Sequence, residues 1–243
     1  PTTYLCGVNC PANPGAWQLH GAFHKRVRKE RKAREDGGVA QQRHRELAER
    51  GARVAAQTGD EYMKLLAEAA RYGSEEDWRR AARTFREAIA LRPDKPDAYL
   101  NLGVTLEISG HRVEAVQWYL EAKERMPVGS EEWARATANA FDMLKQDECA
   151  EVAKPEWWND EGLKALSARV VRAASNDAAA NLMRAEVLSG LADAWEARPR
   201  SAAELMDAAA HYDRAVAIDP APAVKAELAD RADWCRRQSV ETS

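Results

Sequence analysis

A group of residues in this sequence recurs after 34 positions. The stretch AARTFREAIALRPDKP begins at Ala81, and the stretch AVQWYLEAKERMPVGS begins at Ala115. The matched pairs are Ala81 and Ala115, Phe85 and Tyr119, Ala88 and Ala122, and Pro93 and Pro127. Small residues let two antiparallel helices approach closely, an aromatic ring fills the space beside them, and a proline ends the second helix. The period therefore predicts a stack of helix pairs.

The segment before the second copy completes a known pattern. It reads PDAYLNLGVTLEISG from Pro96, with Tyr99, Leu102 and Gly103 at its fourth, seventh and eighth places. With the repeated positions, this resembles the tetratricopeptide repeat (TPR), whose pattern is Trp-x2-Leu-Gly-x2-Tyr, then Ala-x3-Phe, then Pro. The resemblance implies an all-α fold, a TPR-like α-solenoid of helix-turn-helix pairs.

The pattern extends over residues 60–243, which we expect to form the repeat domain. The first pair starts after Gly59, with Asp60 as the helix N-cap. Its expected core positions are Leu65, Ala69 and Tyr72, and Glu68 departs from the leucine of the family. We expect a capping pair, Ser74 with Asp77, at the start of the second helix.

The later repeats are less regular. A third pair begins near Ser130 with Trp133, but residues 145–160 interrupt the register as an inserted arm, in which Trp157 and Trp158 are expected to fill the core. A fourth pair runs from about Asp177 to Ile218, with a capping box at Ser201 and Glu204. A terminal capping helix follows, with its inward side chains at Val224, Leu228, Ala232 and Cys235.

Charge divides the chain unequally. Residues 1–58 contain 11 Lys and Arg but 5 Asp and Glu, whereas the remainder contains 25 and 34. Within the basic part, the run Lys25–Arg34 belongs to an expected helical linker at residues 25–59. It carries no aromatic residues that could stack on bases, so a solvated linker is favoured over nucleic-acid binding.

The first 24 residues contain two short-spaced pairs of metal-ligand residues. These are Cys6 and Cys10, with three residues between them, and His20 and His24, also with three residues between them. Two thiolates and two imidazoles suit tetrahedral Zn²⁺. A degenerate finger that holds no metal is the alternative.

The same segment resembles the end of a MYND-type zinc finger. Tyr4 precedes the first cysteine, the spacing from Trp17 to His20 matches, and His24 stands where the family has cysteine. The family arrangement implies two zinc ions, with Cys6 and Cys10 on one and the histidines on the other. Its first four cysteines would lie upstream of Pro1. The sequence does not start with methionine, so a leader can also be missing.

The cellular location follows from what the sequence lacks. It has no run of about 18 apolar residues, and its four cysteines are too scattered for a disulfide framework. We expect a reducing compartment, cytoplasm or nucleus, and no membrane span.

The TPR resemblance also implies a concave groove, lined by the first helix of each pair, that binds a peptide or a partner helix. The groove positions are Met63, Ala67, Ala70, Asp97, Asn101, Val104, Ile108, Arg135, Ala138 and Asp142. Asn101 is suited to peptide binding because an amide both donates and accepts. Ala70 and Val104 stand where repeats that grip acidic chaperone tails have lysine or asparagine, which argues against that clamp.

These features predict a non-catalytic scaffold for a protein or peptide partner. No catalytic triad, phosphate loop or paired carboxylates were recognised. One alternative is the non-catalytic portion of a MYND/SET-type protein-lysine methyltransferase, in which a finger precedes a helical tail. A nucleic-acid-associated protein that uses the basic linker is the other.

Overall fold

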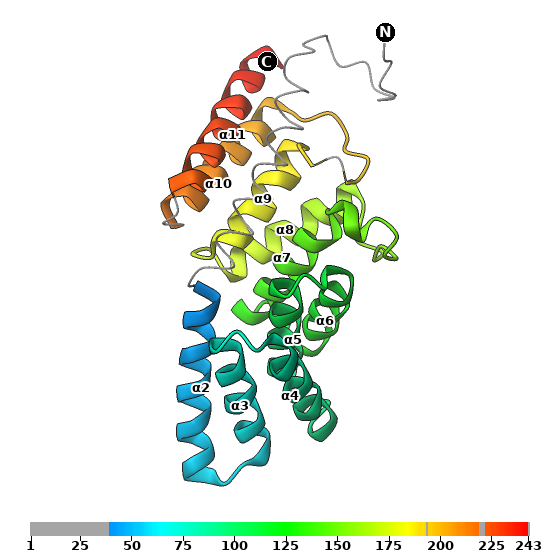
Figure 1. Ribbon diagram of the computed structural model, residues 1–243. Coiled ribbons are helices and arrows are strands. Elements are labelled where there is room, and N and C mark those ends of the chain that lie inside the picture. Colours follow the sequence, from blue (N-terminus) through cyan, green and yellow to red (C-terminus); the bar gives the residue numbers. More distant parts are fainter. Residues whose placement is uncertain (1–38, 193, 219–221, 243) are drawn as a thin grey trace.

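The computed structural model describes residues 39–192, 194–218 and 222–242, and all regular secondary structure in these ranges is helical. The helices are stacked along one direction (Figure 1). They are α2 (Val39–Thr58), α3 (Glu61–Ser74), α4 (Trp78–Leu91), α5 (Pro96–Ile108), α6 (Arg112–Arg125), α7 (Glu131–Leu144), the 3-10 helix η1 (Asp147–Cys149), α8 (Asp160–Ala173), α9 (Ala178–Ser189), α10 (Ala202–Ile218) and α11 (Pro222–Glu241). The all-α expectation is confirmed for this part of the chain.

Consecutive helices pack against each other as a TPR-like repeat. The pairs are α3 with α4, α5 with α6, α7 with α8, and α9 with α10, and α11 packs on α10 as the expected terminal cap. At the repeated positions the alanines and the aromatic residues have 0% of their surface exposed, whereas the prolines Pro93 and Pro127, at the helix ends, are exposed; the buried residues are Ala81, Phe85, Ala88, Ala115, Tyr119 and Ala122. The 34-residue spacing therefore identified the packing positions correctly.

Helix α2 belongs to this stack rather than to a separate linker. It packs along α3, and a Cβ atom added to Gly51 would lie 2.9 Å from Cβ of Ala67. The buried side of α3 also differs from the expected one. Tyr62 and Leu66 are 3% and 2% exposed, whereas two of the expected core residues, Leu65 and Tyr72, are only half-buried. The register expected for the first helix is thus corrected, except at Ala69, which is fully buried.

Most helix ends follow the expected capping. Gly59 has a φ of 67°, and Asp60 accepts a hydrogen bond from the Tyr62 amide. The capping box of Ser201 and Glu204 is formed: the Ser201 amide donates to the Glu204 carboxylate, and the Glu204 amide donates to the Ser201 hydroxyl oxygen. The prediction that Ser74 and Asp77 form a capping pair at the start of α4 was wrong. Asp77 caps α4 alone, while Ser74 still belongs to α3 and donates to the Arg71 carbonyl.

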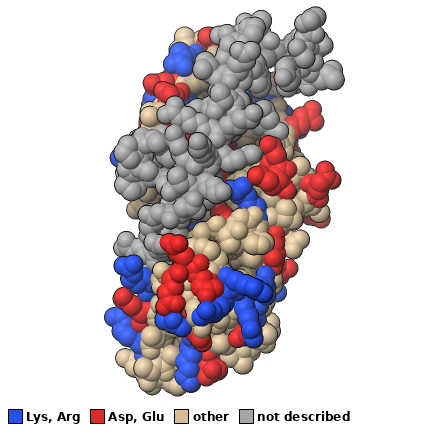
Figure 2. All heavy atoms as spheres, in the orientation of Figure 1, with Lys and Arg blue, Asp and Glu red and all other residues tan. Residues whose placement is uncertain are grey.

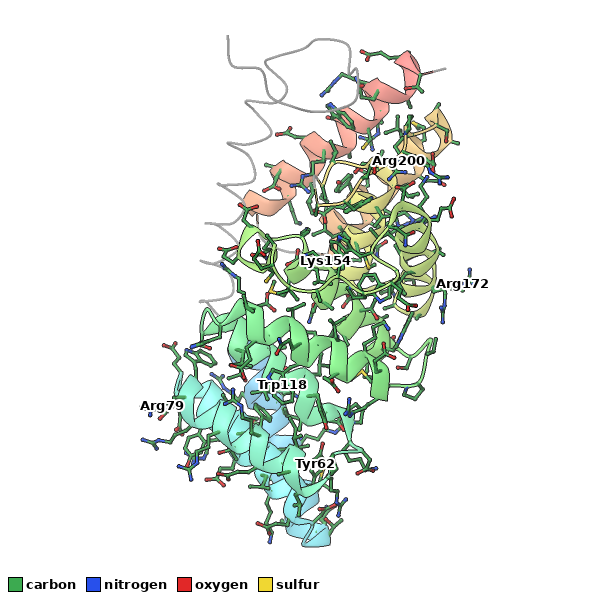
Figure 3. The ribbon with its side chains drawn as sticks, turned by 90° about the vertical axis from the view of Figure 1, so that its right-hand side faces the viewer. Tyr62, Arg79, Trp118, Lys154, Arg172 and Arg200 are labelled. Atoms are coloured by element: carbon green, nitrogen blue, oxygen red, sulfur yellow. The ribbon has the colours of Figure 1, made fainter. Side chains whose placement is uncertain are left out.

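The inserted arm between α7 and α8 packs inward, as its tryptophans indicated. The Trp158 ring lies 5.6 Å from Phe141 and 6.1 Å from Trp195, and its indole N–H donates to the Ala194 carbonyl. Lys154 lies over this ring and donates to the carbonyls of residues 144 and 149 (Figure 3). Aromatic contacts thus hold the arm against α7.

A second insertion, between α9 and α10, is held by charge. Arg200 donates to both carboxylate oxygens of Asp160 on α8, at 2.9 and 2.6 Å. Burial alone would raise the pKa of Asp160, but Arg200 and Lys164 reverse this and lower it to about 2.

The described cysteines and the last helix match the expectation of small buried residues. Cys149 and Cys235 are free and 0% exposed. Burial raises the pKa of both thiols, that of Cys235 to about 12. Leu228 and Ala232 are buried with Cys235, while the side chain of Val224 is not among those described.

Candidate functional site

Helices α5 and α7 carry the expected groove residues that retain exposed surface. On α5, Asp97 is exposed and three side chains are half-buried: Asn101, Val104 and Ile108. On α7, 37% of the Arg135 side chain is exposed. Together these residues offer polar and apolar surface on two helices, and we call this set of residues the α5–α7 strip.

Two groove positions expected on the first repeat are covered. Ala67 lies against Gly51 of α2 and is 8% exposed, and Ala70 is fully buried. Only Met63 keeps a half-buried side chain there. Ala67 and Ala70 therefore add no accessible surface to the α5–α7 strip.

Two expected positions on α7 are also buried, but they line a cavity. Ala138 is 2% and Asp142 is 7% exposed. Between α7 and α9 they border a cavity of about 30 Å³, whose other lining residues are Asn139, Phe141, Ala179, Leu182, Met183 and Glu186. A space of this size accommodates about two water molecules or a methyl-sized group.

A chain of ion pairs borders this cavity. Lys145 Nζ lies 2.9 Å from Asp142 Oδ1 and 2.5 Å from Glu186 Oε2. Arg231 of α11 joins Glu186 at 2.9 Å and Glu227 at 3.1 Å. Burial alone would raise the pKa of Glu186, but the two cations lower it below its usual range. The carboxylate of Glu186 therefore stays ionised in the interior and connects α7, α9 and α11.

The polar groups of the α5–α7 strip are partly committed. Asn101 Nδ2 donates to the Asp97 carbonyl at 2.7 Å, and no donor among the described residues bonds its Oδ1. Arg135 Nε lies 4.0 Å from Asp177 Oδ2, a contact that holds the guanidinium beside the strip. Asn101 thus presents an acceptor, and Arg135 presents donors.

Asn139 is a candidate residue that the sequence reasoning missed. It is half-buried, lies one turn after Arg135 and lines the cavity. Its spacing of four from Arg135 was the available signal, because residues four apart share a helix face.

The proposed zinc ligands Cys6, Cys10, His20 and His24 lie outside the described residues, and so does the basic run Lys25–Arg34. Among the described residues, no group of three His, Cys, Asp or Glu side chains could hold a metal ion. No described helix is long and apolar enough to cross a membrane.

Comparison with known proteins gives structural matches only. No protein-family model matches the sequence, and no curated protein does. YrrB, described as a TPR protein with an unusual peptide-binding site, is 16% identical over 80% of this chain and 89% of that chain, with a TM-score of 0.49. Two structures of MamA are also similar. The first is 15% identical over 72% of this chain and 93% of that chain, with a TM-score of 0.44. The second is 16% identical over 74% of this chain and 85% of that chain, with a TM-score of 0.47. The repeat assignment rests on the buried alanines and aromatic rings described above.

Proposed function

We propose that the protein is a non-catalytic binding protein that holds an extended peptide on the α5–α7 strip. The observation that carries this proposal is the combination of polar and apolar surface there. Polar groups are offered by Asn101, Arg135 and Asn139, and apolar surface by Val104 and Ile108. Binding sites typically use a few polar groups for orientation and apolar area for affinity.

The chemistry of the strip suits a peptide main chain. The Oδ1 atom of Asn101 can accept from a peptide N–H, because its Nδ2 is already bonded to Asp97. The guanidinium of Arg135 can donate to a peptide carbonyl, since Asp177 holds only one side of it, at 4.0 Å. The half-buried Val104 and Ile108 supply area that a peptide side chain can cover.

The test is selection of peptides from a random display library on the immobilised protein, followed by affinity measurement with fluorescent peptides. Asn101→Ala is expected to weaken binding by about 1–3 kcal/mol, roughly 5- to 150-fold. Gln117→Ala, an exposed amide on α6, is the matched control and should bind normally. If selected peptides bind Asn101→Ala and Arg135→Ala as tightly as the unaltered protein, the strip is not the site.

The proposal includes a location in the cytoplasm or nucleus. Free thiols at the buried Cys149 and Cys235 are compatible with a reducing compartment.

A further inference from the structure

Helices α7 and α9 lie side by side and run in the same direction. Near their beginnings, Arg135 of α7 lies 4.0 Å from Asp177, the N-cap residue of α9. Near their ends, Lys145 lies 2.5 Å from Glu186. The partners of the two contacts are almost equally far apart in the sequence, so the two helices advance together. The residues that line the cavity follow the first contact and lead up to the second on both helices.

The cavity opens beside the α5–α7 strip. Three of its lining residues keep exposed surface and mark the opening: Asn139, Ala179 and Leu182. Asn139 lies four residues after Arg135, which belongs to the strip, and residues four apart share one face of a helix at a separation of about 6 Å. A peptide held by Arg135 would therefore pass the opening of the cavity.

The interior of the cavity is suited to a small, uncharged group. Its buried walls include Ala138, Phe141 and Met183, which are 2%, 1% and 1% exposed. The carboxylates of Asp142 and Glu186 also border it, and an anionic side chain would be repelled by them. The long side chains of lysine and arginine exceed a space that accommodates about two water molecules.

The charges on the visible surface favour no ligand of one sign. Figure 2 shows Lys and Arg interspersed with Asp and Glu over the lower part of the molecule. On α4, for example, Arg80 pairs with Asp77 and Arg83 with Glu87. Opposite charges at such short range largely cancel. Selection among peptides is then left to shape, and the cavity is the feature that supplies it.

We infer that the α5–α7 strip selects peptides that place a small uncharged side chain, alanine or serine, in the cavity between α7 and α9. The inference rests on the peptide binding proposed above and names the kind of peptide. An alanine methyl group matches the volume and is removed from water. A serine hydroxyl can bond the amide of Asn139, which both donates and accepts.

The position of the small residue in the peptide also follows. An extended chain advances about 3.3 Å per residue, and Asn139 lies about 6 Å along α7 from Arg135. The small residue should therefore stand about two positions from the residue whose carbonyl Arg135 binds. Glycine at that position leaves the cavity empty, and leucine fits only if the walls move.

The peptides retained from the random display library test this directly. They should share one position that is alanine or serine. Fluorescent copies of one such peptide then carry glycine or leucine at that position. Glycine should weaken binding roughly fourfold, because burial of one methyl group is lost. Leucine should weaken it by at least about fivefold, because it overfills the cavity. Tighter binding of the leucine copy would indicate a general apolar surface and overturn the inference.

Two neighbouring alanines give matched variants of the protein. Ala179 lines the cavity and Ala178 does not, and both are half-buried in the first turn of α9. Valine adds two methyl groups at either position, with the same cost in helix propensity. Ala179→Val should bind the alanine peptide at least about fivefold more weakly and lose its preference for this peptide over the glycine copy. Ala178→Val should bind both peptides as the unaltered protein does, and circular dichroism checks that both variants keep their helices.

The two proposals can fail separately. Peptides that depend on Asn101 but share no small residue, or that bind both valine variants equally, overturn the cavity inference and leave the strip as the site. Peptides that are insensitive to Asn101→Ala and Arg135→Ala but sensitive to Ala179→Val overturn the strip and retain the cavity. If the library yields no bound peptide, both proposals are wrong.

Discussion

Tyr119 of α6 packs directly on Gly103 of α5. A Cβ atom added to Gly103 would lie 2.7 Å from Cδ1 and Cε1 of the Tyr119 ring. Gly103 lies inside a helix, where replacement of glycine by alanine normally stabilises by about 1 kcal/mol. Because the ring leaves no space, Gly103→Ala should instead lower the free energy of unfolding, by roughly 1–3 kcal/mol.

Urea unfolding followed by circular dichroism measures this change. The sign of the effect is decisive, since helix propensity and close packing predict opposite directions. The same Gly103→Ala change is then made in a Tyr119→Leu protein, in which the ring is absent. In that protein the change should lower the free energy of unfolding by less than it does in the unaltered protein. A more stable Gly103→Ala protein would contradict the packing.

The sequence predicted Gly103 from its match to the TPR pattern and Tyr119 from its repetition of Phe85, and such positions report contacts that successive helix pairs share. It did not predict the burial of Ala67, because α2 covers this residue through Gly51, a contact made once in the chain. The ion pair between Glu186 and Arg231 was not predicted for the same reason: the partners are 45 residues apart, and the insertion between α9 and α10 lies between them. Periodicity thus gives the shared core, while capping helices and insertions decide which groove positions remain open.

Zinc binding at Cys6, Cys10, His20 and His24 remains a proposal with a direct test. Elemental analysis of the purified protein should find stoichiometric zinc, and binding should weaken at acid pH as the ligands take up protons. Removal of metal with a chelator should leave the unfolding transition of the described helices unchanged, because no metal-ligand group lies among them. Protein without zinc would instead support a finger that no longer holds metal.

His211 of α10 should make stability depend on pH. Its Nδ1 donates to Asn181 Oδ1 at 3.0 Å, and burial, with Arg214 and Arg184 nearby, lowers its pKa from 6.5 to about 4. Between these values the unfolded chain binds more protons than the folded one, so folding is stabilised fully above pH 6.5 and progressively less toward pH 4.

The expected loss is on the order of 1 kcal/mol between neutral pH and about pH 5. His211→Asn keeps a donor for Asn181 but cannot titrate, so its stability should fall less over the same interval. Urea unfolding of both proteins at the two pH values gives the comparison. Equal pH dependence in both proteins would show that other groups control it.

The last prediction concerns Glu186, which is 3% exposed and pairs with both Lys145 and Arg231. Replacement by the isosteric Gln removes the charge but leaves both cations in the interior. Breaking a buried ion pair by removing one partner costs about 3–5 kcal/mol, whereas exposed pairs contribute about 0–1 kcal/mol. Glu161→Gln, whose exposed carboxylate lies 2.8 Å from Arg198, is therefore the matched control. Chemical unfolding should show a large loss for Glu186→Gln and almost none for Glu161→Gln. Equal small losses would mean that Glu186 does not connect α7, α9 and α11.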